Sequence, residues 1–124
     1  MPECEYLFVY GTLRAAAATA WARFLQSQSD FVDSGRTPGW LFQLDGYPGM
    51  TVREDHDAWV RGEVYLLHDP AATLPRLDTY EGCEFERQVV SVTLDHGGTI
   101  SAWAYIYRGD TQGKLRITSG DDLS

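Results

Sequence analysis

The sequence feature that most constrains the fold is a pair of alternating segments joined by a short polar turn. Residues 88–94 and 99–107 both alternate apolar and polar side chains, which is the period of a strand with one buried face. Residues 95–98 (DHGG) separate them, and glycines suit such a turn because they adopt positive φ without strain. We therefore expect an antiparallel hairpin, and with it a largely antiparallel sheet.

The segment before this hairpin contains further strand signals. Residues 5–10 (EYLFVY) form an apolar run rich in aromatic and β-branched residues, ended by Gly11, which predicts a buried strand. Residues 31–44 contain two short strand candidates, broken by glycine and by a Pro-Gly pair. Residues 59–67 (WVRGEVYLL) begin by alternating and then become apolar, as a half-buried strand would.

Two segments are predicted to form helices. Residues 15–28 contain strong helix formers, and their large apolar side chains fall three and four positions apart on one face: Trp21, Phe24 and Leu25. Further on, Asp69 and Pro70 suit the N-cap and the first position of a helix. An interior Pro75 interrupts the backbone hydrogen bonds, so we expect a kink there or a helix that begins near Thr73.

Together these elements predict an α+β fold, a small, mostly antiparallel β-barrel or curled sheet with flanking helices. The 124 residues fit a single domain, 1–124, since domains commonly hold about 100–150 residues. A hydrophobic content of 44% is enough to build a core for such a domain.

Charge and apolar patterning exclude several kinds of partner. The formal net charge is −8 and the ten basic residues are scattered, so nucleic acid and anionic membranes are not expected to bind. No apolar run approaches the roughly 18–20 residues that span a bilayer, and the first residues do not resemble a secretory signal. Cys4 and Cys83 lie outside any CxxC motif, which favours a reducing cytoplasm with both thiols free.

The turn after the first predicted strand is a candidate ligand site. It consists of Tyr10-Gly11-Thr12-Leu13, and glycine there lets the main chain turn sharply and approach a ligand closely. Successive unpaired N–H groups at such a turn would bind a carboxylate or phosphate. The alternative is a plain strand-to-helix turn, which the local pattern alone favours.

A second candidate is the acidic end of the second predicted helix. Asp78 and Glu81 lie three residues apart on one helical face, and Tyr80 precedes the second carboxylate. A carboxyl group beside aromatic walls loses hydration, which raises its pKa and suits it to proton transfer near neutral pH. The alternative is an exposed acidic helix end, which is the usual role of such residues.

These motifs, taken in order, resemble the γ-glutamylcyclotransferase-like family. Residues 10–13 (YGTL) look like its signature turn, and residues 60–65 (VRGEVY) like its next strand. Residues 77–82 (LDTYEG) resemble its LDxxEG segment, followed by Phe85-Glu86-Arg87 where the family often has Tyr-x-Arg. Residues 103–105 (WAY) and 119–121 (SGD) match its late strand and tail, and residues 81–83 (EGC) resemble the AIG2-like, γ-glutamylamine branch.

The resemblance implies an enzyme that needs neither a metal nor an organic cofactor. In this family the α-amino group of a γ-glutamyl amine or peptide attacks its own γ-carbonyl, which releases 5-oxoproline and the attached amine. The glutamate of LDxxEG, here Glu81, acts as the general acid and base, and the turn amides hold the α-carboxylate. We assign substrate binding to Tyr10, Gly11, Thr12, Leu13, Tyr47 and Tyr105; the leaving amine and the oligomeric state stay open.

Three other interpretations were weighed against this one. Cys83 and His96 could form an acyl-transfer pair, but no nucleophile motif surrounds them. His56 lies among acidic residues, but neighbours on one loop rarely converge on a metal ion. The rival from another class is a non-catalytic module that binds a small carboxylate in the same pocket, and Glu81 separates the two because a binder needs no such acid.

Overall fold

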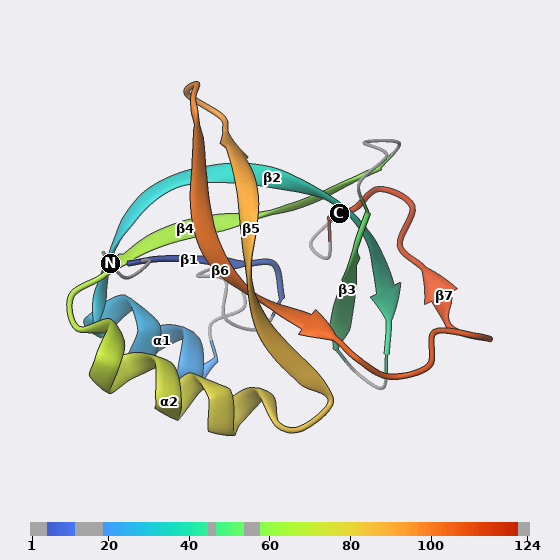
Figure 1. Cartoon of the computed structure of the whole chain (residues 1–124), viewed down its shortest axis with the longest axis horizontal. Helices are drawn as coiled ribbons and strands as arrows, with labels where there is room; N and C mark the ends of the chain where they lie inside the picture. Colours follow the sequence, from blue (N-terminus) through green and yellow to red (C-terminus); the bar gives the residue numbers. More distant parts are fainter. Residues whose placement is uncertain (1–4, 12–18, 45–46, 54–57, 122–124) are drawn as a thin grey trace.

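The computed structural model describes residues 5–11, 19–44, 47–53 and 58–121. Within these ranges one helix follows the first strand and a second helix follows β4 (Figure 1). Their order is β1 (Tyr6–Val9), α1 (Ala20–Ser27), β2 (Ser29–Gln43), β3 (Pro48–Val52), β4 (Trp59–Leu67), α2 (Pro70–Glu81), β5 (Phe85–Leu94), β6 (Thr99–Tyr107) and β7 (Leu115–Arg116).

Five of the strands close into a barrel. The ring runs β1–β4–β2–β5–β6 and returns to β1, because β2 also pairs with β5 and β6 also pairs with β1. These contacts are antiparallel except the closing one between β1 and β6, where Leu7 lies opposite Trp103. The predicted fold class, a small and mostly antiparallel barrel with flanking helices, is confirmed.

The β5–β6 hairpin forms as its sequence predicts. Its register runs from Phe85 opposite Tyr107 to Thr93 opposite Thr99, and the N–H of Leu94 donates to the carbonyl of Gly98 across the turn. Gly97 and Gly98 have φ of 105° and 90°, values that other residues adopt only with strain. The hairpin tip therefore depends on these two glycines.

The two short strands expected in residues 31–44 are instead one continuous strand, β2. Pro38 and Gly39 lie where β2 passes from pairing with β4 to pairing with β3, so they mark a change of partner and not an end. At Gly35 a Cβ atom would lie 2.8 Å from the carbonyl oxygen of Thr93. This glycine therefore permits the close approach of β5 that closes the barrel.

Helix α2 begins at Pro70, earlier than the predicted alternative start near Thr73. The Asp69 side chain accepts a hydrogen bond from the N–H of Ala72 at 3.3 Å and caps the helix, as expected. Pro75 lies inside the helix, where it removes one backbone donor. Of the helix predicted at 15–28, the structure describes residues 20–27 as α1; Thr19 caps it and its first predicted residues lie outside the described ranges.

The core has two parts, one on each side of β1. Phe8 and Tyr10 point into the barrel, whereas Leu7 and Val9 point outward beneath the helices, where they pack with Leu25 and Leu77. Figure 1 shows α1 and α2 together on one side of the barrel, with the β5–β6 tip on the opposite side. The end of β1 thus lies where the barrel interior meets the helical layer.

Candidate active site

A pocket of about 380 Å³ opens where β1 ends beside the end of α2. Its wall combines main chain and side chains from β1, α2, β5, β6 and the segment before β3. The residues lining it are Phe8, Val9, Tyr10, Gly11, Tyr47, Pro48, Tyr80, Glu81, Phe85 and Tyr105. Five of the predicted site residues are therefore brought together: Tyr10, Gly11, Tyr47, Glu81 and Tyr105. Thr12 and Leu13 lie outside the described residues.

Glu81 is the last residue of α2, and the helix ends directly after it. Gly82 has φ 81°, and its N–H donates to the carbonyl oxygen of Asp78 at 3.1 Å. A residue with a Cβ atom adopts this φ only with strain, so Gly82 is the residue type that this helix end requires. The chain then departs toward β5, and the Glu81 carboxyl group is left at the pocket wall.

The Glu81 carboxyl group is desolvated and unpaired within the described part of the chain. No described residue donates a hydrogen bond to it or forms an ion pair with it. Burial raises its pKa from 4.5 to about 7. The carbonyl end of a helix carries partial negative charge, which disfavours the ionised carboxylate in the same direction. Near neutral pH both protonation states of Glu81 are therefore populated.

The Tyr10 hydroxyl group is committed to the structure. It donates to the carbonyl oxygen of Tyr105 at 2.5 Å and accepts from the N–H of Met50 at 3.2 Å. Burial raises the Tyr10 pKa above its ordinary value, so the hydroxyl keeps its proton. Tyr10 therefore ties the end of β1 to β3 and β6, and its hydroxyl group is already engaged by protein atoms.

The other two tyrosines predicted for the site also direct their hydroxyl groups to acidic side chains. Tyr105 donates to Asp78 Oδ1 at 2.7 Å, and Tyr47 donates to Glu84 Oε2 at 2.8 Å. Burial, followed by this hydrogen bond to Asp78, raises the Tyr105 pKa. Both residues line the pocket with their hydroxyl groups engaged, whereas Glu81 is an acid at its wall that no described donor engages.

Gly11 lies at the pocket for a steric reason. A Cβ atom at this position would lie 2.8 Å from Cγ of Pro48, closer than real Cβ contacts come. The glycine therefore lets the end of β1 approach the start of β3. The close approach of this turn to a ligand stays a prediction, since the neighbour observed is a proline side chain.

Sequence reasoning missed much of the apolar wall and all of the polar contacts. Phe85 was noted only as a departure from Tyr-x-Arg, yet it lines the pocket and lies between the rings of Tyr47 and Tyr107, with centroids 6.2 and 5.7 Å away. Asp78 was paired with Glu81 by spacing, but its actual partner is Arg87. The alternation of β1 could have assigned Phe8 and Tyr10 to one face.

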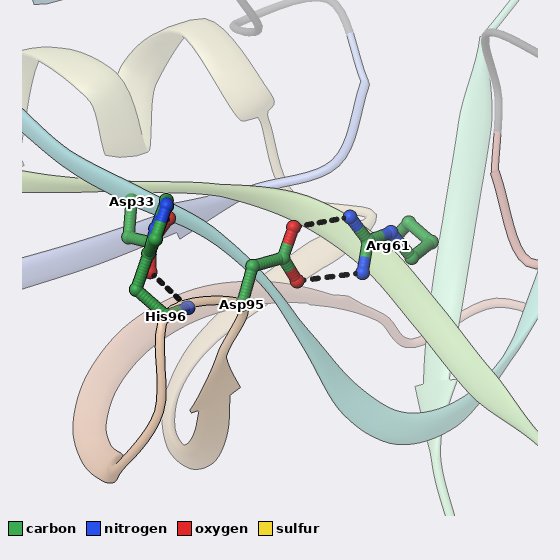
Figure 2. A network of polar contacts seen from close by, with 4 residues as sticks. All are labelled: Asp33, Arg61, Asp95 and His96. Carbon is green, nitrogen blue, oxygen red and sulfur yellow. Dashed lines mark hydrogen bonds and ion pairs between the residues drawn. The ribbon is translucent and has the colours of Figure 1, made fainter.

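The alternative acyl-transfer pair of Cys83 and His96, already disfavoured by the sequence, is excluded by their places in the fold. Cys83 precedes β5 and His96 follows it, and ten residues of strand separate them by about 30 Å. The His96 imidazole instead contacts Asp33 at 2.8 Å (Figure 2). His56 lies outside the described residues.

The described residues also bear on other classes of site. They contain no group of three or more His, Cys, Asp or Glu side chains arranged to hold a metal ion. Nor does any of their helices have the length and apolar character needed to cross a membrane.

Comparison with known proteins matches nearly the whole chain. The sequence model of the family described as "Gamma-glutamyl cyclotransferase, AIG2-like" matches residues 7–122. The chain is 34% identical over 107 residues to "Putative gamma-glutamylcyclotransferase MJ1514" of Methanocaldococcus jannaschii, covering 83% of this chain and 84% of that protein. It is 30% identical over 117 residues to "Putative gamma-glutamylcyclotransferase YkqA" of Bacillus subtilis, covering 93% of this chain but only 40% of that protein.

Solved structures have the same fold. The crystal structure of YkqA superposes with a TM-score of 0.75 at 29% identity, covering 96% of this chain and 39% of that one. The crystal structure of an AIG2-like protein from mouse gives a TM-score of 0.70 at 20% identity, covering 90% of this chain and 82% of that one. At this identity the mouse protein supports the fold alone.

Proposed function

This chain belongs to the gamma-glutamyl cyclotransferase, AIG2-like family, and on that premise we propose that it releases 5-oxoproline from a γ-glutamyl amine or γ-glutamyl peptide. The reaction is an intramolecular aminolysis in which Glu81 acts as general acid and base. The observation that carries the proposal is the desolvated Glu81 carboxyl group at the wall of the pocket, which has no hydrogen-bond or ion-pair partner in the described part of the chain.

The chemistry requires one bond to form, one to break and one proton to move between two nitrogens. The α-amino nitrogen of the substrate attacks the γ-carbonyl carbon, closing a five-membered lactam, and the bond to the leaving nitrogen then breaks. The attacking nitrogen loses a proton and the leaving nitrogen gains one. No water is consumed, and no electrons are exchanged with a cofactor.

Glu81 suits both proton steps. Its pKa of about 7 means that, near neutral pH, the carboxylate is available to accept a proton from the attacking nitrogen. The same pKa makes the resulting carboxylic acid ready to pass that proton to the leaving nitrogen. One group that serves both nitrogens in turn is sufficient, because both nitrogens are bonded to the same reacting carbon in the intermediate.

The rest of the pocket would shape the substrate for cyclisation. The rings of Tyr10, Tyr47 and Tyr105 form an aromatic wall, and their hydroxyl groups are bound to protein atoms, so the wall is rigid. Holding the γ-glutamyl group in a folded pose brings nucleophile and carbonyl together and removes much of the entropic barrier. We assign the α-carboxylate to the main-chain amides of Gly11, Thr12 and Leu13, as the family resemblance implies.

The alternative, a module that binds a small carboxylate without turnover, is less well supported by the charges. An ionised Glu81 at the wall would repel an anionic ligand, and its burial adds a desolvation penalty. A binding module gains nothing from either effect. A proton-transfer role explains why such a group is retained in the pocket.

The proposal is tested by incubating the protein with a panel of γ-glutamyl amines and γ-glutamyl dipeptides and measuring 5-oxoproline. The matched control is the same compounds acetylated on the α-amino nitrogen, which keeps the γ-amide but removes the nucleophile. We expect turnover of at least one free compound and none of its acetylated form. Release of the amine from both forms would indicate hydrolysis, and binding of 5-oxoproline without turnover of any compound would favour the binding module.

A further inference from the structure

An ion pair ties the end of α2 to the two strands that face it. Arg87 of β5 contacts Asp78 through Nε to Oδ1 at 2.9 Å and through Nη2 to Oδ2 at 3.2 Å. Tyr105 of β6 donates its hydroxyl to the same Asp78 Oδ1 at 2.7 Å. The Arg87 guanidinium also lies 4.4 Å over the ring of Trp103. One carboxylate in the last turn of α2 is therefore held from β5 and from β6.

This pair continues into the floor of the pocket. The carbonyl oxygen of Tyr105 accepts the Tyr10 hydroxyl proton, and that hydroxyl in turn accepts the N–H of Met50. On the helix side, the carbonyl oxygen of Asp78 accepts the N–H of Gly82, the residue after Glu81. Asp78 is thus fixed by its side chain to the sheet and by its main chain to the segment that carries Glu81.

Losing one partner of the pair would leave a single charge about one helical turn from Glu81. Asp78 lies three residues before Glu81, a spacing that puts two side chains on one helix face about 5–6 Å apart at Cβ. An unpaired carboxylate there would repel the Glu81 carboxylate, and an unpaired arginine would attract it. The titratable groups that line the pocket with Glu81 are Tyr10 after β1, Tyr47 with its bound Glu84, Tyr80 of α2 and Tyr105 of β6. Tyr105 also lines the neighbouring hollow that contains Asp78 and Arg87.

We propose that Asp78 and Arg87 are positioning residues for Glu81: their ion pair, held by Tyr105, fixes the end of α2 against the sheet and leaves no net charge from the pair beside Glu81. This inference rests on the proposed function for its catalytic consequence. The charge balance itself does not depend on turnover, and it can be measured separately.

A purely structural ion pair and a positioning pair differ in one measurable way. Removing either partner of a pair that stabilises the fold but lies too far away to act on Glu81 would lower stability and leave the titration of Glu81 unchanged. For a positioning pair the two single changes act with opposite signs. Asp78→Asn leaves the Arg87 cation unpaired, which stabilises the Glu81 carboxylate and lowers its pKa; Arg87→Gln leaves the Asp78 anion unpaired, which raises it.

The experiment measures the Glu81 carboxyl titration by NMR and the pH dependence of 5-oxoproline release in Asp78→Asn, Arg87→Gln and the double variant. Asp95→Asn and Arg61→Gln are matched controls, because these residues form a bidentate pair of the same kind at 2.7 and 2.8 Å on the far side of the barrel. We expect displacements of the midpoint by about half a pH unit or more in opposite directions for the two single variants. The double variant should return toward the wild-type midpoint, and both controls should match the wild type.

The rates should separate positioning from substrate binding. In both single variants kcat should fall about tenfold or more, while KM changes little, because a displaced Glu81 impairs proton transfer more than binding. If a single variant fails to fold, Tyr105→Phe removes one hydroxyl and keeps the ring, and the same fall in kcat at unchanged KM is expected.

Two outcomes would overturn the inference. One is a Glu81 midpoint that stays at the wild-type value, or moves in the same direction, in both single variants. The other is a Tyr105→Phe protein with wild-type kcat. A wild-type protein that releases no 5-oxoproline would contradict the proposed function instead, and the titration shifts would still decide the charge balance.

Discussion

The pocket end of the molecule and the tip of the β5–β6 hairpin hold their carboxylates in opposite ways. At the tip, Arg61 donates two hydrogen bonds to Asp95 (Figure 2). Asp33 accepts a hydrogen bond from the main-chain N–H of His96, and its other oxygen contacts Nδ1 of the His96 ring. The His96 N–H bond and the Arg61 hydrogen bonds lower the pKa of Asp33 and of Asp95, respectively. At the pocket, Glu81 lacks such a partner among the described residues and its pKa is raised.

The difference has a direct physical meaning. A carboxylate that gains donors on folding is more easily ionised in the folded state and stabilises it above its ordinary pKa. A carboxyl group that only loses water on folding destabilises the folded state once it is ionised. The paired carboxylates Asp33 and Asp95 at the tip therefore stabilise the folded protein. Glu81 at the pocket exchanges protons near neutral pH, and its ionised form lowers the stability of the folded protein.

The largest expected effect comes from removing the acid of Glu81 while keeping its shape. Glu81→Gln should lower kcat for 5-oxoproline release by about 10²–10⁴-fold, the usual loss for one general acid or base. Steady-state kinetics with the best substrate of the panel measure it. Asp95→Asn, the same kind of change at the tip, should leave kcat at the wild-type value, and equal losses in the two variants would contradict the assignment.

The same two variants should move stability in opposite directions. Because folding raises the Glu81 pKa, its contribution to stability falls as pH rises from about 4.5 to 7 and stays reduced above that. At pH 8 Glu81→Gln should therefore be more stable than the wild type by on the order of 1–2 kcal/mol. Asp95→Asn loses an exposed ion pair and should be less stable by under about 1 kcal/mol. Urea unfolding at pH 8 measures both.

Replacing two glycines with positive φ distinguishes the effect of backbone strain on stability from its effect on activity. Gly82 at the end of α2 and Gly97 at the tip have φ of 81° and 105°, and in both cases a Cβ atom would meet open space. Replacing either with alanine should cost about 1–2 kcal/mol of stability. Only Gly82→Ala should also lower kcat, because it displaces the residue beside Glu81. Thermal unfolding and kinetics on both variants check this; a fall in kcat for Gly97→Ala alone would reverse the comparison.

The smallest effect concerns the pH dependence at the tip. The hydrogen bond to Asp33 raises the His96 pKa above 6.5, so this contribution to stability is complete below pH 6.5 and is lost as pH rises through the folded value. Asp33 is the converse case, since its contribution is lost as pH falls below its ordinary 3.8 toward the folded value. His96→Gln should make the free energy of unfolding less dependent on pH above pH 6.5, as measured by unfolding at several pH values. An unchanged pH dependence would show that His96 does not contribute to it.

Features that depend on residues close together in the sequence could be predicted, and features that depend on distant residues could not. The hairpin and the Asp69 cap are local, so alternation and turn residues predicted them correctly. Barrel closure depends on β1 meeting β6 at Leu7 and Trp103, almost a hundred residues apart, and no local pattern contains that contact. The continuity of β2 was also missed, because its proline and glycine mark a change of partner strand.

The site shows the same division. Glu81 and the glycine turn were identified through ordered motifs that resemble a family, and the structure brings Glu81 and Gly11 to one pocket. The pairing of Asp78 with Arg87 and Tyr105 could not be read from spacing, since these residues meet only when β5 and β6 pack against α2. Spacing predicted that Asp78 and Glu81 form a pair of carboxylates. In the structure Asp78 forms an ion pair with Arg87, and Glu81 is the single acid at the pocket.

The claim that Glu81 is held desolvated at the pocket is tested most directly by titrating its carboxyl carbon with NMR in glutamate-labelled protein, using Glu81→Gln to assign the resonance. We expect a midpoint near 7 for Glu81. A Glu81 midpoint close to 4.5 would show a carboxyl group in ordinary contact with water, and would contradict the account.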